Sequence, residues 1–152
     1  MGAFKFRLDS YLKLKQHEEK SAWNEVLKQQ GRVSLIQDSI DTVDSAMTAA
    51  REALSGLGGE HVYSFGQAQI IEESLSAQSV KLQSLFREKA NEERTLEILK
   101  QKYFEKKRDA KIIENLKDRK KAEFDKGQSK LEDKNNEEIA RTMMQTRKKL
   151  HE

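Results

Sequence analysis

Neither cysteine nor proline occurs in this sequence of 152 residues, and only seven of the residues are glycine. The absence of cysteine excludes disulfide bonds and thiolate metal sites, and it fits a reducing compartment. Charged residues make up 36% of the chain, while the residues that form turns are scarce. This composition is typical of long helices or coiled coils.

Long apolar runs are also missing. The longest apolar stretches are only a few residues, too short to span a membrane. The first ten residues, MGAFKFRLDS, lack the apolar core of about 7–15 residues that a signal peptide needs. Position six is Phe rather than Ser or Thr, which argues against myristoylation of the Met-Gly start. These features lead us to expect a cytoplasmic protein, and the mean hydropathy of −0.89 argues against a large round core.

The first half of the chain carries apolar residues at alternating steps of three and four. Ten of the thirteen positions in this first seam are apolar, and the alternation is the heptad pattern of a left-handed coiled coil. Asp9 and Ser10 stand before it, and either can cap a helix. The pattern predicts a helix over about residues 9–55. The seam consists of Leu12, Lys15, Glu19, Ala22, Val26, Gln29, Val33, Ile36, Ile40, Val43, Met47, Ala50 and Leu54.

A second seam of the same kind predicts a helix over about residues 65–150. Nine of its thirteen positions are apolar, and Ser64 and Gln67 stand before it at the spacing of a capping box. The seam consists of Ile71, Leu75, Gln78, Leu82, Leu85, Lys89, Glu92, Leu96, Leu99, Tyr103, Lys106, Ala110 and Ile113.

Four of the seven glycines cluster between the two seams, at Gly56, Gly58, Gly59 and Gly66. Glycine adopts the positive φ angles that end many helices, so the cluster predicts a helix stop, a reversal over residues 56–64 and a new helix start. A short connection makes neighbouring helices antiparallel. We therefore predict an all-α fold, a long antiparallel two-helix coiled coil in one domain of residues 1–152.

The antiparallel arrangement also predicts which seam residues meet. If Leu54 faces Ile71, the numbers of facing residues always sum to 125. The other pairs are then Ile40–Leu85, Val26–Leu99, Ala22–Tyr103 and Glu19–Lys106. The interface is not wholly apolar, because Gln29 is expected to face Leu96 and Met47 to face Gln78.

Beyond Ile113 the second seam loses its apolar character, and residues 114–152 hold eleven Lys or Arg and nine Asp or Glu. This predicts a solvated C-terminal helical overhang, with Gly127 a weak point that costs about 1 kcal/mol relative to Ala. Ile139, Ala140, Met143 and Met144 form a short apolar stripe on the overhang. The stripe is a docking face or a piece of core, and the adaptable side chain of methionine suits docking.

No arrangement of residues points to catalysis. The three histidines, His17, His61 and His151, lie far apart in the sequence. The segment SGLGGE is rich in glycine but follows a predicted helix and lacks the Lys-Ser/Thr of a phosphate loop. Carboxylates are plentiful, yet a pair of helices offers no walled pocket to change their pKa values. We therefore expect that the protein is not an enzyme and that it binds no cofactor, metal or small-molecule ligand.

Basic residues gather in residues 100–126, where eleven basic and six acidic residues give a net charge of +5, against +3 for the whole chain. The excess can meet an acidic protein, can meet phosphates, or can simply keep the helix soluble. Acidic residues are interleaved and no nucleic-acid-binding motif accompanies them, so nucleic acid is the least favoured partner. Trp23 is expected to pack beside the seam or to contact a partner, and Phe4 and Phe6 to form a staple before the first helix.

The two ends of the chain resemble the FliJ family of flagellar export proteins. The start, FKFRLDSYLKLKQHEEKSAWNEVLKQQ, is similar to the family's N-terminus, in which Phe-x-Phe-Arg-Leu leads into a segment rich in Leu, Lys or Arg and Glu. The later segment ENLKDRKKAEFDKGQSKLEDKNNEEIA is similar to the family's C-terminal part, with its Leu-Lys-x-Arg block, aromatic residue and acidic stretch.

The resemblance implies a non-enzymatic, antiparallel coiled coil similar to the central stalk subunit of rotary ATPases. It implies a role in flagellar type III protein export and so in motility. The implied partners are the hexameric export ATPase, the membrane export-gate protein and export chaperones. The implied location is the cytoplasm, peripherally at the inner face of the cell membrane at the flagellar base.

By the same resemblance, the residues expected to contact the ATPase ring are Arg7, Lys13, Lys117, Arg119, Lys120 and Lys121. The family's gate contact lies in the first half of the second helix, where no motif of this chain matches, so no gate residue is assigned. Two alternatives stay open: the stalk of a non-flagellar injectisome, against which the Phe-x-Phe-Arg-Leu start argues, and a helical arm that binds nucleic acid.

Overall fold

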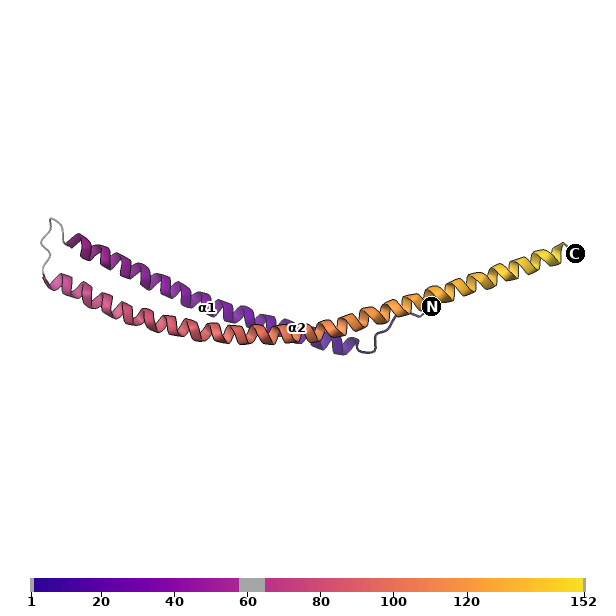
Figure 1. The fold of residues 1–152 in the computed structure, drawn as a ribbon, viewed down its shortest axis with the longest axis horizontal. Coiled ribbons are helices and arrows are strands. Elements are labelled where there is room, and N and C mark those ends of the chain that lie inside the picture. The colour runs from indigo at the N-terminus through magenta and orange to yellow at the C-terminus, as the bar shows by residue number, and fades with distance from the viewer. Residues whose placement is uncertain (1, 58–64, 152) are drawn as a thin grey trace. The chain divides into compact units, whose positions relative to one another are not determined.

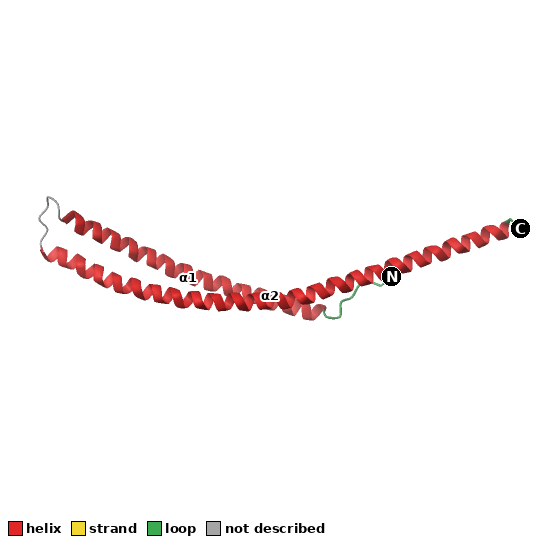
Figure 2. Ribbon diagram, in the orientation of Figure 1, coloured by secondary structure: helices red, strands yellow, loops and turns green. Residues whose placement is uncertain are grey.

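The computed structural model of the chain describes residues 2–57 and 65–151 (Figure 1). Two helices, α1 (Asp9–Leu57) and α2 (Phe65–Leu150), account for nearly all of these residues. Figure 2 shows helix and loop, and no strand, in the described parts of the chain. The all-α fold of two long helices that pack against each other is therefore confirmed. No stretch of either described helix combines the length and the apolarity needed to cross a bilayer.

The helix ends differ from the sequence prediction at the first helix's C-terminus. α1 continues to Leu57, so Gly56 lies inside the helix. No described glycine has a positive φ, so the left-handed conformation expected of the glycine cluster does not occur at Gly56. The helical conformation is open to glycine as to any residue, so the hydrogen-bond ladder runs on through it. Gly58, Gly59 and Ser64 lie outside the described residues, and α2 starts at Phe65, directly after the predicted cap Ser64.

The start of α1 also differs in detail. The backbone N–H of Leu12 donates to the carbonyl of Leu8 at 2.8 Å, which places Leu8 in the N-cap position and Asp9 in the first helical turn. The Asp9 carboxylate binds lysine side chains instead of a backbone amide. Ser10 makes no hydrogen bond through its hydroxyl to any described residue. An acidic group in the first turn is still favourable, because it faces the positive end of the helix dipole.

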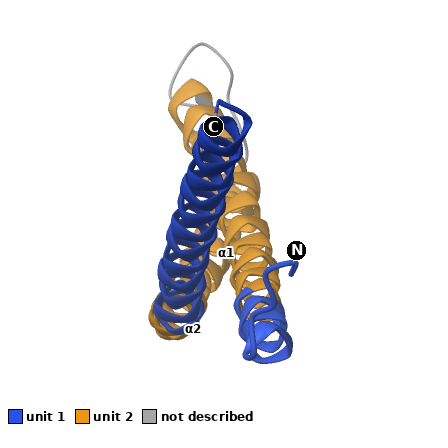
Figure 3. Cartoon of the chain, turned by 90° about the vertical axis from the view of Figure 1, so that its right-hand side faces the viewer, with its two compact units in different colours: residues 1–19, 106–152 blue, residues 20–105 orange. Residues whose placement is uncertain are grey.

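The chain divides into two compact units (Figure 3). Unit 1 comprises Met1–Glu19 and Lys106–Glu152, and unit 2 comprises Lys20–Glu105. Each unit contains a segment of α1 and a segment of α2. That a single domain spans residues 1–152 stays a prediction.

The predicted seams form the core of both units. All thirteen positions of each seam are buried or half-buried. In α1 the buried residues all belong to the first seam; they are Leu12 in unit 1 and Ala22, Val26, Gln29, Ile40, Val43 and Met47 in unit 2. Val26 is fully buried, and burial of such a side chain stabilises the fold by about 1.5–3 kcal/mol. Both seams are therefore confirmed.

Unit 2 also buries a polar contact. Gln29, 3% exposed, donates from Nε2 to the backbone carbonyl of Glu92 at 2.9 Å and also to the Glu92 carboxylate. The predicted facing residue was Leu96, one turn later in α2. A buried amide needs hydrogen-bond partners, which the Leu96 side chain cannot supply, so the amide reaches for Glu92 instead. Sequence spacing identified the buried position but not its partner.

Trp23 packs in unit 2 on the ring of Tyr103, with ring centroids 5.0 Å apart and tilted by 47°. The predicted neighbour of Tyr103 was Ala22, the residue before Trp23. Trp23 remains 42% exposed, so it has one packed side and one open side. A Lys102–Glu25 ion pair of 3.7 Å lies near this contact in sequence and links the same two helix segments.

Candidate functional site

Unit 1 brings the N-terminal motif and the C-terminal basic block together. The Nζ of Lys117 in α2 donates to Oδ1 of Asp9 at the start of α1, at 2.9 Å. The ring of Phe4 packs on that of Phe124 with centroids 5.6 Å apart. Two segments separated by more than a hundred residues in the sequence are thus held side by side by one ion pair and one aromatic contact.

The segment before α1 is positioned by a turn and by its aromatic side chains. The backbone N–H of Asp9 donates to the carbonyl of Phe6 at 3.2 Å, which turns the chain into the helix. Phe4 and Phe6 are both half-buried, although they lie outside any helix. The expected staple is replaced by a contact across unit 1, because Phe4 packs on α2. Tilted ring pairs of this kind add about 0.5–1.5 kcal/mol to the area they bury.

The Asp9 carboxylate is the electrostatic centre of this contact. Besides Lys117, it pairs with Lys13 one turn later in α1, at 3.4 Å. The hydrogen bond from Lys117 is the main cause that holds the pKa of Asp9 below its usual 3.8. The carboxylate therefore stays ionised, and two of the six expected ring-contacting residues are engaged within the chain.

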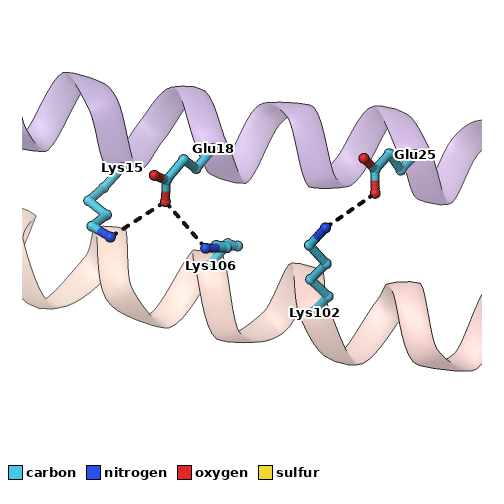
Figure 4. A network of polar contacts seen from close by, with 5 residues as sticks. All are labelled: Lys15, Glu18, Glu25, Lys102 and Lys106. Atoms are coloured by element: carbon cyan, nitrogen blue, oxygen red, sulfur yellow. Dashed lines mark hydrogen bonds and ion pairs between the residues drawn. The ribbon is translucent and has the colours of Figure 1, made fainter.

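A second ion network in unit 1 surrounds Glu18 (Figure 4). Its carboxylate lies 3.4 Å from Lys106 of α2 and 3.5 Å from Lys15 of α1. The predicted partner of Lys106 was Glu19. Glu18 stands beside the seam rather than on it, so its carboxylate can reach across the edge of the interface while keeping contact with water. The sequence prediction was therefore one residue off.

The Glu18 network shifts two pKa values. Partial burial acts to raise the pKa of Glu18, but the charges of Lys106 and Lys15 outweigh it and the net pKa is lowered. Partial burial acts to lower the pKa of Lys15, but the neighbouring Glu18 outweighs it and the net pKa is raised. The Nζ of Lys15 also lies 5.3 Å from the centroid of the Tyr11 ring, a cation–π contact.

The six expected ring-contacting residues fall into two groups. Three are paired: Lys13 and Lys117 with Asp9, and Lys120 with Glu123 at 3.7 Å. The other three are exposed and form no ion pair with any residue in the described ranges; they are Arg7, Arg119 and Lys121. Only the second group keeps its full charge available to a partner, and we call these residues the free cations.

Two surface hollows of unit 1, each of about 560 Å³, border the N-terminal segment. Arg7 and Lys120 line one of them, beside Leu116 and Phe124. Lys121 lines the other, beside Asp9 and Lys117. Arg119 lines neither hollow, so these two hollows do not unite all of the predicted residues.

Lys5 lines both hollows and was missed in the sequence. The available signal was the Phe-Lys-Phe alternation: in an extended segment, neighbouring side chains point to opposite sides, and burial of Phe4 and Phe6 exposes Lys5. Phe124 was also missed as an anchor, because its partner lies outside the seams.

The apolar stripe on the C-terminal part of α2 is exposed. Ile139, Met143 and Met144 are 55%, 66% and 70% exposed and border one shallow hollow on α2. Every one of residues 131–150 is exposed, and no described segment covers the stripe. A surface of adaptable apolar side chains without cover is suited to contact with another helix.

The charged and apolar groups of unit 1 lie at its surface. Among the described residues, no group of three or more His, Asp or Glu is arranged to hold a metal ion. The resolved pKa shifts belong to surface ion pairs and keep each group in its ordinary charged form at neutral pH. Unit 1 thus presents fixed charges, two hollows and an apolar stripe at its surface.

A sequence profile of the family described as "Flagellar FliJ protein" matches residues 4–149. The matched range contains Phe4, the free cations and the apolar stripe, and it covers nearly all of the chain. Comparisons with curated proteins and with solved structures gave no match.

Proposed function

Because the chain belongs to the FliJ family and is thereby a component of flagellar type III protein export, we propose that it acts as a stalk-like coiled coil for the export ATPase. In this role it promotes the assembly and activity of the hexameric ATPase ring. It also contacts the membrane export-gate protein and escorts export chaperones. It works in the cytoplasm, peripherally at the inner face of the membrane at the flagellar base.

The observation that carries the proposal is the junction of the two terminal motifs in unit 1. Asp9–Lys117 and Phe4–Phe124 fix the N-terminal segment against α2, so the hollows and their cations form one prearranged surface. A prearranged surface loses less conformational entropy on binding than a flexible one. The positive charge of this surface would draw the chain to an acidic ring lumen and orient it there.

On the basis of their ion pairs, we give different tasks to five of the six basic residues. Arg7, Arg119 and Lys121, the free cations, contact the ring directly. Lys13 and Lys117 act indirectly, because both pair with Asp9, and the Lys117 pair links the start of α1 to α2. The chain supplies no catalytic group of its own; hydrolysis belongs to the ATPase, and the stalk favours its assembled state by binding it.

The test combines the purified chain with the export ATPase of the same organism and follows ATP hydrolysis and ring assembly by mass. The key variant is Arg7→Glu/Arg119→Glu/Lys121→Glu, which reverses the free cations without removing an ion pair. The matched control is Lys28→Glu/Arg32→Glu/Lys81→Glu, three exposed basic residues of unit 2 that form no ion pair with a described residue.

We expect the wild-type chain and the control to raise turnover and the population of hexamers, and the key variant to lose most of this effect. Equal stimulation by all three proteins would place the ring contact elsewhere. No stimulation by the wild-type chain at moderate salt would overturn the stalk role. A steep fall of nucleic-acid binding with salt in the same samples would favour the alternative of a nucleic-acid-binding arm.

A further inference from the structure

Uncharged side chains recur on one face of α2 along residues 131–150. They are Leu131, Asn135, Ile139, Thr142, Thr146 and Leu150, and we call them the tail stripe. Leu131 and Thr142, Asn135 and Thr146, and Ile139 and Leu150 are each eleven residues apart. An eleven-residue repeat keeps side chains on one face of a nearly straight helix. All six are exposed, and Met143 borders them.

The tail stripe continues the packed face of α2 within unit 1. Ala110 is buried on that face, and Ile113, Lys117 and Phe124 are half-buried on it. Gln128, the last half-buried residue, stands eleven residues before Ile139. The face therefore runs on from covered to uncovered residues without turning around the helix. A face that packs on a helix in one half is suited to pack on a helix in the other.

The charges beside the tail stripe differ in sign between its two halves. Residues 131–138 contain four acidic residues and one lysine, a net charge of −3. Residues 139–150 contain four basic residues and no acidic residue, a net charge of +4. A parallel second copy would place like charges together, whereas an antiparallel copy brings each half against its opposite. We propose that the tail stripe pairs with the tail stripe of a second copy of this chain, antiparallel.

The spacing of the stripe fits such a pair. With the two helices antiparallel, Leu131 faces Leu150 of the second copy, Asn135 faces Thr146 and Ile139 faces Thr142. Each of these contacts occurs twice, because the same surface is used on both copies. Asn135 and Thr146 can share a hydrogen bond, and Glu132 comes near Arg147 and Lys149 of the second copy. One alignment thus pairs the two leucines, the two polar residues and the opposite charges, and it sets Ile139 against Thr142.

A second, antiparallel copy of the chain offers opposite charge to both halves of the tail stripe. This charge complementarity favours a second copy over other partners. An acidic partner helix would be repelled by residues 131–138, and a basic one by residues 139–150. The three apolar side chains of the stripe and the neighbouring Met143 make a small interface, so we expect weak association with a dissociation constant on the order of 10 μM. Pairing covers Ile139 and Met143, so it excludes docking of any other partner there. The proposal does not depend on the role at the export ATPase.

The first test measures the mass of the purified full-length chain between about 1 and 200 μM by sedimentation and light scattering. We expect the mass to rise with concentration from 17.6 kDa toward twice that value. Ile139→Ser should keep the chain monomeric throughout. Ile98→Ser, which changes an exposed isoleucine of unit 2, should dimerise like the wild type. Far-UV circular dichroism confirms that both variants keep their helices.

The second test exchanges charges between the two ends of the stripe. Glu132→Lys alone and Arg147→Glu/Lys149→Glu alone should each weaken dimerisation by about tenfold, because like charges then meet twice. An equal mixture of the two variants should dimerise as well as the wild type. Glu137→Lys, on the opposite side of α2 by helical spacing, is the charge-matched control and should change little. Three results would each overturn the proposal: a wild-type chain that stays monomeric at every concentration, an Ile139→Ser variant that still dimerises, or a mixture of the two charge variants that does not regain wild-type dimerisation.

Discussion

Two parts of the molecule use the same kind of helix face with different results. In unit 2, α1 and α2 bury the face between them, and residues such as Val26 and Ile40 lie almost entirely out of water. Along residues 131–150 of unit 1, α2 is just as regular, yet every residue is exposed. Both stretches carry uncharged side chains on one side. What differs is the presence of a facing helix.

The contrast shows which interactions stabilise each part of the fold. A helix that packs on another gains from burial, which is worth about 25 cal/mol for each Å² of apolar surface. An exposed helix depends on local propensity and on pairs of side chains one turn apart, which are worth only a few tenths of a kcal/mol each. The exposed part of α2 should therefore respond to local changes, while unit 2 should respond to changes in packing.

The largest expected effect comes from shortening one isoleucine in each part. Ile40→Ala removes a side chain that is 5% exposed and should lower the free energy of unfolding by about 2–5 kcal/mol. Ile139→Ala makes the same change at a side chain that is 55% exposed and should alter it by less than about 0.5 kcal/mol. Urea unfolding at about 1 μM, below the expected dimer range, measures both. Equal losses would mean that the exposed face is covered in solution.

Much of this contrast could be predicted from the sequence. The three-and-four spacing maps directly onto a helix face, so all thirteen positions of each seam proved to be buried or half-buried. The loss of apolar positions after Ile113 predicted a solvated overhang, and residues 129–150 are exposed, but five positions between 114 and 128 are half-buried. α2 runs through the weak point Gly127 to Leu150. Backbone periodicity alone is sufficient for these conclusions.

Polar partners could not be predicted in the same way. Lys106 binds Glu18 rather than Glu19, and Gln29 binds Glu92 rather than lying only against Leu96. Long side chains reach over several ångströms and choose partners by rotamer and solvation, which residue spacing does not fix. The Oε1 atom of Gln78 illustrates the limit, since it is buried without a partner among the described residues at a position expected to face Met47.

The candidate site shows the same division. Its basic character is evident from residues 100–126, but the sequence could not separate paired from free cations. That separation depends on Asp9 and Glu123, whose carboxylates bind three of the six expected residues. The contact of Phe4 with Phe124 was also out of reach, because it lies outside the seams and has no periodic signal.

A smaller effect is expected from replacing one glycine in each part. Gly31 in unit 2 and Gly127 in unit 1 are both helical, and an added Cβ would meet no atom within 4 Å at either position. Gly31→Ala should raise the free energy of unfolding by about 1 kcal/mol. Gly127→Ala should leave the urea midpoint unchanged and slow amide hydrogen exchange only in the turns around residue 127. A raised midpoint in both variants would show that the exposed part of α2 unfolds together with the rest.

The smallest expected effect concerns the ion pairs of unit 1, which are partly exposed and therefore screened by water. Asp9 and Glu18 have lowered pKa values in the folded chain, so the unfolded chain binds protons more readily at these groups. Their contribution to stability is fully present above their usual values of 3.8 and 4.5, and it is lost as the pH falls through the folded values. Lys15 has a raised pKa, so the contribution of its pair with Glu18 is also lost when the pH rises above 10.5.

Asp9→Asn/Glu18→Gln should therefore flatten the acid dependence of the urea midpoint. The midpoint of the variant should be close to that of the wild type at low pH and below it near neutrality. Asp38→Asn/Asp44→Asn, at exposed residues of unit 2 without ion pairs to described residues, should keep the wild-type dependence. If the Asp9 and Glu18 variant kept the full dependence, the two networks would add nothing to the folded state. Phe4 and Phe124 would then alone hold the N-terminal motif against α2, and Arg7, the free cation in that segment, would depend on this one aromatic contact for its placement.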